Sequence, residues 1–134
     1  MKPTDDMTDE QIREEREKCL AEMVIMTDQV TMWRKSHVNN AIERAPKEGY
    51  EGWDFLIEDL GLEVDTYIWP YASRFYQCGY MTKGEVWSWL AVVEDQKEVM
   101  RRELEELAEE GRKIKLRKNS LKHRLKRRLL RWLA

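Results

Sequence analysis

The sequence predicts an all-α protein: a helical bundle or hairpin of two long helices, with a short aromatic-rich helical middle and a basic amphipathic C-terminal helix. Three observations favour this fold class. Apolar residues recur at steps of three and four along most of the chain, which is the period of a helix. Only 6 Gly and 3 Pro are present, which suits long helices better than a sheet. Six Trp, five Tyr and seven Met supply apolar surface for a core, although 37% of the residues are charged.

The first long helix is predicted to begin at a capping box. The Thr8 side chain is placed to accept a hydrogen bond from the Gln11 amide, and the Gln11 side chain to reach back. An apolar stripe with helical spacing then runs from Ile12 to Ala41. Pro46 is expected to end the helix, because proline has no amide donor and disfavours the helical conformation of the residue before it.

A short helix is predicted in the middle of the chain. The apolar residues from Trp53 to Leu60 lie at i, i+3, i+4 and i+7, which places them on one helical face. Gly61 is expected to stop this helix, with Leu62 folding back as the hydrophobic contact of the stop.

The stretch 63–69 is ambiguous, since apolar and polar or aromatic residues alternate in it as in a strand. A single strand would have no partner, so an extended linker or a first helical turn is expected instead. Pro70 suits the opening turn of a further helix that runs to about Cys78, with Gly79 as its stop.

Aromatic residues cluster between positions 53 and 89, and their helical spacing places most of them in the core. Tyr71, Tyr76 and Tyr80 are the ones expected at the surface. They are candidates for contacting a partner, because aromatic side chains are enriched among the residues that dominate protein interfaces.

The second long helix is predicted to begin at another capping box, formed by Thr82 and Glu85. Its apolar stripe runs from Val86 to Leu107, and Gly111 is expected either to end the helix or to bend it. The two long helices are expected to pack antiparallel, with the middle segment returning the chain between them. Heptad-like spacing predicts a coiled coil and favours a dimer or other oligomer.

The chain divides by charge into an acidic helical body, residues 1–111, and a basic C-terminal helix, residues 112–134. The body holds 13 of the 24 basic residues and all 26 acidic residues, which gives it a formal charge of −13. The C-terminal segment has eleven basic residues and no acidic one. Its basic residues are Arg112, Lys113, Lys115, Arg117, Lys118, Lys122, Arg124, Lys126, Arg127, Arg128 and Arg131. Such an asymmetry indicates an anionic partner, and these eleven residues are the candidate polyanion-binding site.

Three partners fit the C-terminal segment, which Asn119 or Ser120 is expected to cap as a separate helix. Its cations suit the phosphates of a nucleic acid, bound without base-specific readout because no known DNA-binding motif is present. Its apolar stripe from Leu121 to Trp132 also suits a membrane surface, with Trp132 as a candidate contact in the headgroup zone. In the third alternative the stripe packs on the helical body or on a sister subunit, with the basic face against Glu-rich helices.

The sequence contains no catalytic or metal-binding signature. Glycine-rich phosphate loops and the HExxH, CxxC and GxSxG motifs are all absent. Structural zinc sites show short paired spacings, which are lacking among Cys19, His37, Cys78 and His123. We therefore expect no enzymatic activity, cofactor, metal or small-molecule substrate.

The expected class is a non-enzymatic helical binding protein that engages a polyanion, with nucleic acid favoured. The alternative is a protein that acts through protein–protein contacts, in assembly or as an inhibitor whose acidic body imitates a nucleic acid. Two widely spaced cysteines, no apolar run of about 20 residues and a polar first ten residues favour the cytoplasm. For a virus-encoded chain this would be the cytoplasm of the host.

Overall fold

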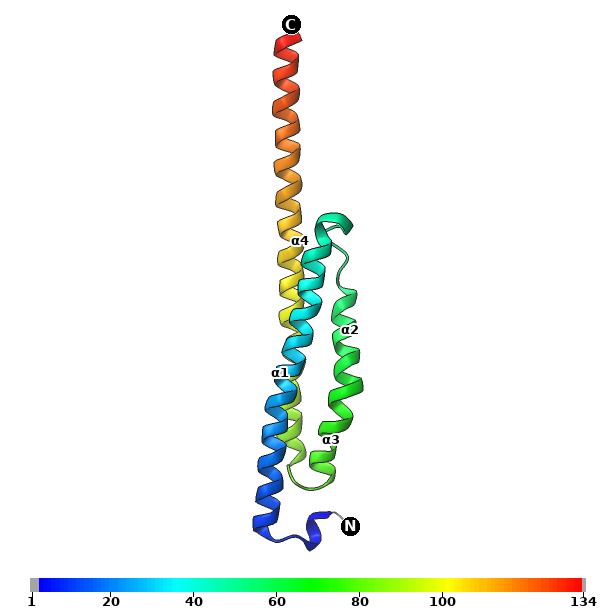
Figure 1. Cartoon of the computed structure of the whole chain (residues 1–134), viewed down its shortest axis with the longest axis vertical. Helices are drawn as coiled ribbons and strands as arrows, with labels where there is room; N and C mark the ends of the chain where they lie inside the picture. The colour runs from blue at the N-terminus through cyan, green and yellow to red at the C-terminus, as the bar shows by residue number, and fades with distance from the viewer. Residues whose placement is uncertain (1–2, 134) are drawn as a thin grey trace.

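The computed structural model describes residues 3–133. The regular elements among these residues are all helical, with no strand, which confirms the all-α prediction. In chain order the elements are a 3-10 turn η1 (Pro3–Asp6), α1 (Asp9–Glu48), α2 (Phe55–Glu63), a π-helical turn η2 (Val64–Ile68), α3 (Trp69–Gln77) and α4 (Lys83–Leu133). α1, the α2–η2–α3 segment and α4 pack side by side as a bundle, and α4 continues far beyond the other two (Figure 1).

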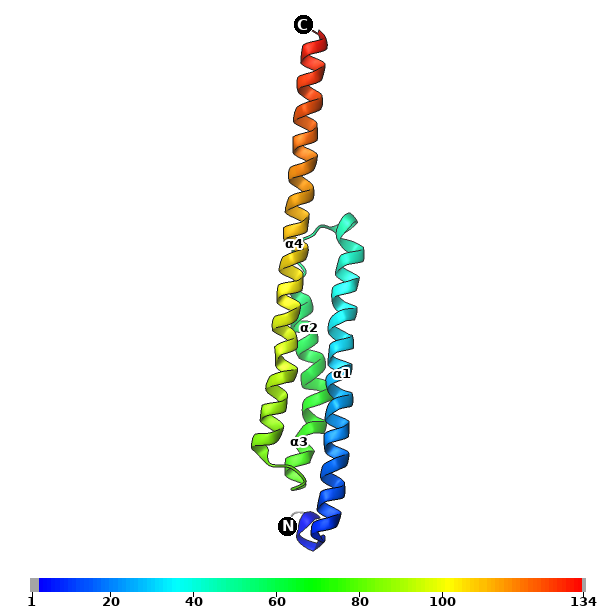
Figure 2. The same cartoon turned by 90° about the vertical axis from the view of Figure 1, so that its left-hand side faces the viewer.

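α1 and α4 run in the same direction (Figure 2). Hydrogen bonds between them advance together along both helices, through the pairs Arg16–Glu85, Thr27–Trp89 and Arg34–Gln96. The expected antiparallel packing of the two long helices is therefore wrong. The physical reason is that α2, η2 and α3 together form a return segment that runs antiparallel to α1 along the bundle. The chain therefore reverses direction twice, and α4 runs in the same direction as α1.

The core lies between these three rods. Its largest fully buried side chains include Val30 of α1, Leu60 of α2 and Met100 of α4. All buried apolar residues of the described chain lie between Cys19 and Leu107, so the segment 1–111 holds the entire described core. Burial of these apolar side chains stabilises the packing of the three amphipathic rods.

α1 begins at the predicted capping box, which is confirmed. The Gln11 amide donates to Thr8 Oγ1 at 3.2 Å, and the Thr8 amide donates to Gln11 Oε1 at 2.9 Å. The helix passes through Pro46 and ends at Glu48, where Gly49 adopts a φ of 104°. The prediction that Pro46 ends the helix is wrong by two residues, because a proline in the last turn removes a single amide hydrogen bond there.

Gly61 does not stop α2, and this prediction is wrong. The glycine lies inside the helix and is buried, while Leu62 is 66% exposed and makes no hydrophobic stop. A Cβ at position 61 would lie 3.0 Å from Lys97 Cε of α4. The glycine therefore allows α2 and α4 to approach each other closely. This role depends on Lys97, which is distant in the sequence.

The stretch 63–69 is not an extended linker but contains a helical turn, as the second alternative expected, although the turn is π-helical and continuous with both α2 and α3. The Trp69 amide donates to the Val64 carbonyl, five residues back, so the backbone makes one wide π-helical turn. Pro70 follows this turn at the start of α3. Proline lacks an amide donor and crowds the preceding turn, and a wider turn accommodates it without interrupting the rod.

α3 ends as predicted, with Gly79 as its stop. The Gly79 amide donates to the Tyr76 carbonyl and the Tyr80 amide to the Phe75 carbonyl, both at 3.0 Å. This pair of bonds is a Schellman motif, and Gly79 adopts the left-handed conformation that the motif requires, with a φ of 83°.

The second predicted capping box is confirmed at the start of α4, and it also joins α4 to α1. The Thr82 amide donates to Glu85 Oε1 at 3.0 Å, and the Glu85 amide donates to Thr82 Oγ1 at 3.1 Å. Arg16 of α1 donates to the same carboxylate, with Nη1 at 2.8 Å from Oε1. Hydrogen bonding from Arg16, followed by that from the Thr82 amide, lowers the pKa of Glu85 to about 2.

The Arg16–Glu85 pair is expected to make stability depend on acid. Because the pKa of Glu85 in the folded chain lies below its ordinary value of 4.5, its stabilising effect is present above about pH 4.5 and is lost as the pH falls towards 2. Urea unfolding of the wild type and of Glu85→Gln at a series of pH values measures this. The difference in unfolding free energy between the two should shrink over that interval, and a difference independent of pH would contradict the ion pair.

Candidate polyanion-binding helix

We call residues 112–133 of α4 the tail. It leaves the bundle beside the loop that joins α1 to α2 and continues alone to Leu133 (Figure 1). α4 is unbroken from Lys83, so Gly111 does not end it and neither Asn119 nor Ser120 caps a separate helix. The prediction of a separate C-terminal helix is wrong, because the bundle holds Gly111 in helical conformation and the tail simply extends the same rod.

The cations of the tail are available to a ligand. All eleven basic side chains predicted as the site are exposed. Among the described residues only Arg112 of this set is tied to the bundle, through ion pairs with Glu109 at 2.9 Å and Glu51 at 3.4 Å. The other ten have no acidic side chain of residues 3–133 within ion-pair distance.

The apolar row of α4 continues into the tail, with Gly111 and Lys118 at two of its positions. In the bundle this row includes Leu104 and Leu107, which are buried against the other helices. Its next apolar members are Ile114, Leu121 and Leu125, which follow Leu107 at intervals of seven, seven and four residues, as on one face of a coiled coil. Leu121 and Leu125 are 58% and 52% exposed, so the row loses its partner where the bundle ends.

Cations line both flanks of this exposed row. Arg117, Arg124 and Arg131 follow one another at seven-residue intervals and form a line along one flank. Lys115 and Lys122, also seven apart, lie on the other flank. The tail therefore presents an apolar strip between an arginine edge and a lysine edge.

A groove of about 600 Å³ lies where the tail leaves the bundle. Tyr50 and Ile114 contribute its apolar wall, and Lys115, Lys118 and Lys122 contribute a cationic wall. An aromatic ring beside several ammonium groups suits a ligand that carries both a flat apolar part and negative charge. Sequence reasoning did not find this groove, because Tyr50 precedes Ile114 and the three lysines by more than 60 residues in the chain.

Gly111 permits Tyr50 to cross α4 at this junction. A Cβ at position 111 would lie 2.3 Å from Tyr50 Cβ and 2.6 Å from Tyr50 Cγ, which is much closer than non-bonded carbons approach. A glycine inside a long helical pattern was the sequence signal for such a close approach.

Replacing Gly111 with alanine is expected to lower the stability of the wild-type chain and to raise the stability of a Tyr50→Gly variant. Gly111→Ala alone should destabilise the bundle by about 1–3 kcal/mol, because the Tyr50 loop must shift. With Tyr50→Gly already present, the same change should stabilise the bundle by up to about 1 kcal/mol, since alanine is the better helix former. Urea unfolding followed by circular dichroism measures both. A stabilising effect in the wild-type background would show that Tyr50 does not rest on Gly111 in solution.

The aromatic residues proposed as partner contacts do not join the tail in one surface. Tyr71 is 43% exposed and donates its hydroxyl to Glu22 Oε1 at 3.0 Å. Tyr76 of α3 and Tyr80, just after α3, are partly buried against the core. α3 and its connection to α4 lie at the end of the bundle opposite to the tail (Figure 1). Trp132 is 89% exposed at the far end of the tail.

Fewer aromatic side chains than expected fill the core. Between positions 53 and 89 only Trp53 and Phe75 are buried. Others pack against the core from its edge, namely Trp69, Tyr76, Tyr80 and Trp89. Smaller aliphatic side chains and Met fill the narrow space between three close helices instead.

Comparison with protein-family models, with curated proteins and with solved structures finds no match to this chain. Within the described residues, no helix is long and apolar enough to cross a membrane. Function is therefore inferred from the tail and the bundle themselves.

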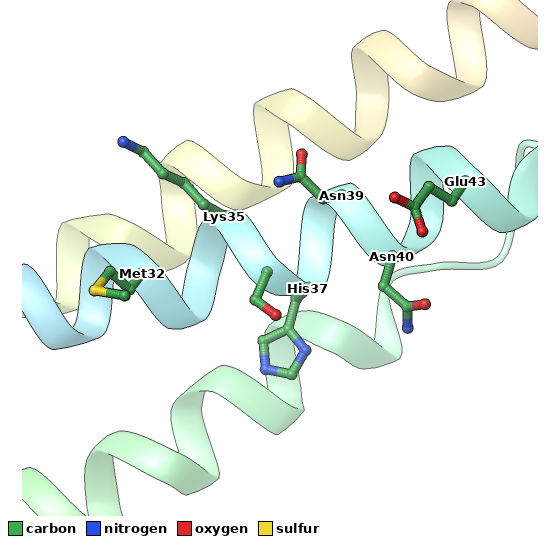
Figure 3. Close-up of a pocket in the computed structure, with 7 residues that line it drawn as sticks. Met32, Lys35, His37, Asn39, Asn40 and Glu43 are labelled. Atoms are coloured by element: carbon green, nitrogen blue, oxygen red, sulfur yellow. The ribbon is translucent and has the colours of Figure 1, made fainter.

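The polar side chains along α1 do not converge on a ligand. A depression of about 620 Å³ runs along α1, and all of its lining residues belong to that one helix. Figure 3 shows that its polar side chains diverge: His37 points towards the return segment, where it pairs with Glu63, while Lys35 and Asn39 point elsewhere. A binding site needs polar groups aimed at a common point, and this surface has none.

The described cysteines belong to no metal-binding cluster, and Cys19 is buried. Among residues 3–133, no group of three or more His, Cys, Asp or Glu side chains is arranged to hold a metal ion. Cys19 is 4% exposed, and burial raises the pKa of its thiol to about 11. A buried thiol of this kind is a poor nucleophile at neutral pH.

Proposed function

We propose that this chain is a non-enzymatic binding protein whose tail engages a polyanion, with nucleic acid as the favoured partner. The observation that supports this is that the tail is an exposed cationic helix that extends beyond an acidic bundle. The 22 residues of the tail span about 33 Å. Charges in water are screened beyond about 8 Å at physiological ionic strength. Most of the tail therefore lies outside the repulsive field that the bundle would exert on a polyanion.

Nucleic acid is favoured because its phosphates form an extended line of charge that matches an extended line of cations. An α-helix fits the major groove of duplex DNA or lies along a phosphate backbone. Arg117, Arg124 and Arg131 would contact phosphates with the paired geometry that guanidinium groups allow. Contacts to phosphate carry no sequence information, so binding without base-specific readout is expected.

The groove at the root of the tail adds a second element to this proposal. Tyr50 would offer a ring beside the lysines on which an unpaired base could stack. Single-stranded nucleic acid would use both the tail and this groove, whereas duplex would use the tail alone.

A membrane surface is the second candidate, supported by the exposed apolar strip of the tail. Leu125, Leu129 and Trp132 are all more than half exposed and flanked by cations, as in helices that lie in the interface of anionic bilayers. Protein–protein inhibition through the acidic bundle is a third possibility, supported by the charge of residues 1–111 alone.

The test compares the full chain with the segment 1–111, titrated against duplex DNA, single-stranded RNA and anionic liposomes at two salt concentrations. The truncated chain keeps the entire described core. The proposal predicts tail-dependent, salt-sensitive binding to nucleic acid and none to liposomes. Binding to liposomes alone would replace nucleic acid by a membrane surface, and binding to none of the three would overturn the proposal.

A further inference from the structure

A second groove lies at the opposite end of the bundle, between α1 and the first turns of α4. It has a volume of about 670 Å³ and is mainly apolar, with Leu20, Met23 and Val24 on one side and Trp89 on the other. Leu20 and Val24 are 44% and 63% exposed. The bundle thus leaves apolar side chains of two parallel helices in water, where a further helix would cover them.

The end of the tail also carries apolar side chains that are exposed to water and that a partner would cover. Leu129, Trp132 and Leu133 are 62%, 89% and 80% exposed. The tail of the same chain cannot reach the groove, because α4 is an unbroken rod that points away from it (Figure 2). A tail from a second copy has no such restriction.

The lengths match an antiparallel arrangement of two copies. From Gly111, where the bundle ends, 21 residues lead forward to Trp132 and 22 lead back to Trp89. All of them lie in one α-helix, so the rise per residue is the same in both directions. Two copies that cross at Gly111 would therefore each bring Trp132 to the groove of the other.

The same antiparallel arrangement also places acidic side chains of one copy beside the cations of the other copy's tail. One face of α4 carries Val92 and Val99 on the side of the groove and Glu106 and Glu110 on the side of Gly111, at intervals of seven, seven and four residues. The positions between them on this face, Gln96 and Glu103, accept hydrogen bonds from Arg34 of α1. Glu106 and Glu110 are exposed and have no ion pair among the described residues. In the antiparallel register they lie level with the root of the partner's tail, where the cations begin.

We infer that two copies form a closed two-fold dimer, in which each tail lies antiparallel in the α1–α4 groove of the other copy. The contact is the same on both sides, so the assembly closes at two and does not polymerise. This goes beyond the proposed function, because the tail serves assembly here. The partner copy and a polyanion compete for the same cations.

The test is the molar mass in low salt, measured by light scattering or sedimentation. The full chain is expected at twice its 16.2 kDa, and the segment 1–111 at the monomer mass. Val24→Glu places a carboxylate in the groove and should return the full chain to a monomer. Ile25→Glu is the matched control, since Ile25 is 66% exposed and lies outside the groove, and it should remain a dimer. Circular dichroism checks that both variants stay folded.

Two results would overturn this inference. One is a monomeric full chain at every concentration at which it is soluble. The other is a dimer that survives Val24→Glu, which would place the contact elsewhere, for instance between two tails. Because Val24→Glu leaves every tail cation in place, its binding to duplex DNA tests the proposed function separately. A Val24→Glu monomer that binds no polyanion would refute the proposed function alone.

Discussion

Replacing Arg124, Arg127, Arg128 and Arg131 with glutamate is expected to lower polyanion affinity at least ~100-fold while the bundle stays folded. Each phosphate contact to duplex DNA contributes about 0.9 to the slope of log affinity against log salt, so the salt dependence should weaken as well. All four side chains are exposed and lie outside the core, so circular dichroism and thermal unfolding should be unchanged apart from the tail. Fluorescence anisotropy with labelled duplex DNA and single-stranded RNA at two salt concentrations measures the loss.

The control for this variant changes the net charge by the same amount on the bundle. Its four substitutions to glutamate replace Lys35, Lys47, Arg74 and Arg102. These side chains are exposed and in no ion pair among the described residues. Affinity in the control should fall only a few-fold, through long-range repulsion. Equal losses in the two variants would show that net charge, and not the tail, governs binding.

Leu60→Ala is expected to destabilise the protein by about 2–5 kcal/mol. Leu60 lies on α2, is 0% exposed and fills the space between the three rods. Its truncation therefore removes buried apolar surface and also leaves a cavity. Urea unfolding followed by circular dichroism gives the change in unfolding free energy. A loss of this size is a large fraction of the stability of a small domain.

Leu62→Ala is the matched control, because it makes the same chemical change two residues further along the same helix. Leu62 is 66% exposed, so its replacement should change stability by no more than about 0.5 kcal/mol. Comparable losses at both positions would mean that the chain ends α2 at Gly61 and folds Leu62 back, as the sequence pattern had indicated.

Helix starts and stops were predictable where the signal is local. Thr8 and Thr82 form capping boxes with a residue three positions on, and Gly79 ends α3 through bonds within five residues. The same local rules failed at Gly61 and Gly111. Gly61 makes room for Lys97 of α4, and Gly111 makes room for Tyr50 of the loop between α1 and α2, so neither glycine marks a helix end.

The candidate site was predictable in its composition and not in its geometry. The run of eleven cations and the apolar stripe are visible in the sequence, but their presentation on an uninterrupted rod is not. The groove at the root of the tail depends on Tyr50, which carries no local signal. The groove proposed for the second copy joins Val24 to Trp89, and their proximity follows from the parallel course of α1 and α4.

The amino-acid sequence by itself determined the all-α class, the capped starts of the two long helices and the separation of charge between residues 1–111 and the tail. These properties depend on spacing and composition within a few turns of helix, which is the range over which caps and periodicity act. Only the tertiary structure decided that α1 and α4 run parallel, that the π-helical turn η2 joins α2 to α3, and that α4 continues through Gly111. Each of these depends on how rods pack over distances of tens of residues, where close contact between side chains outweighs the local preference of a glycine or a proline to end a helix.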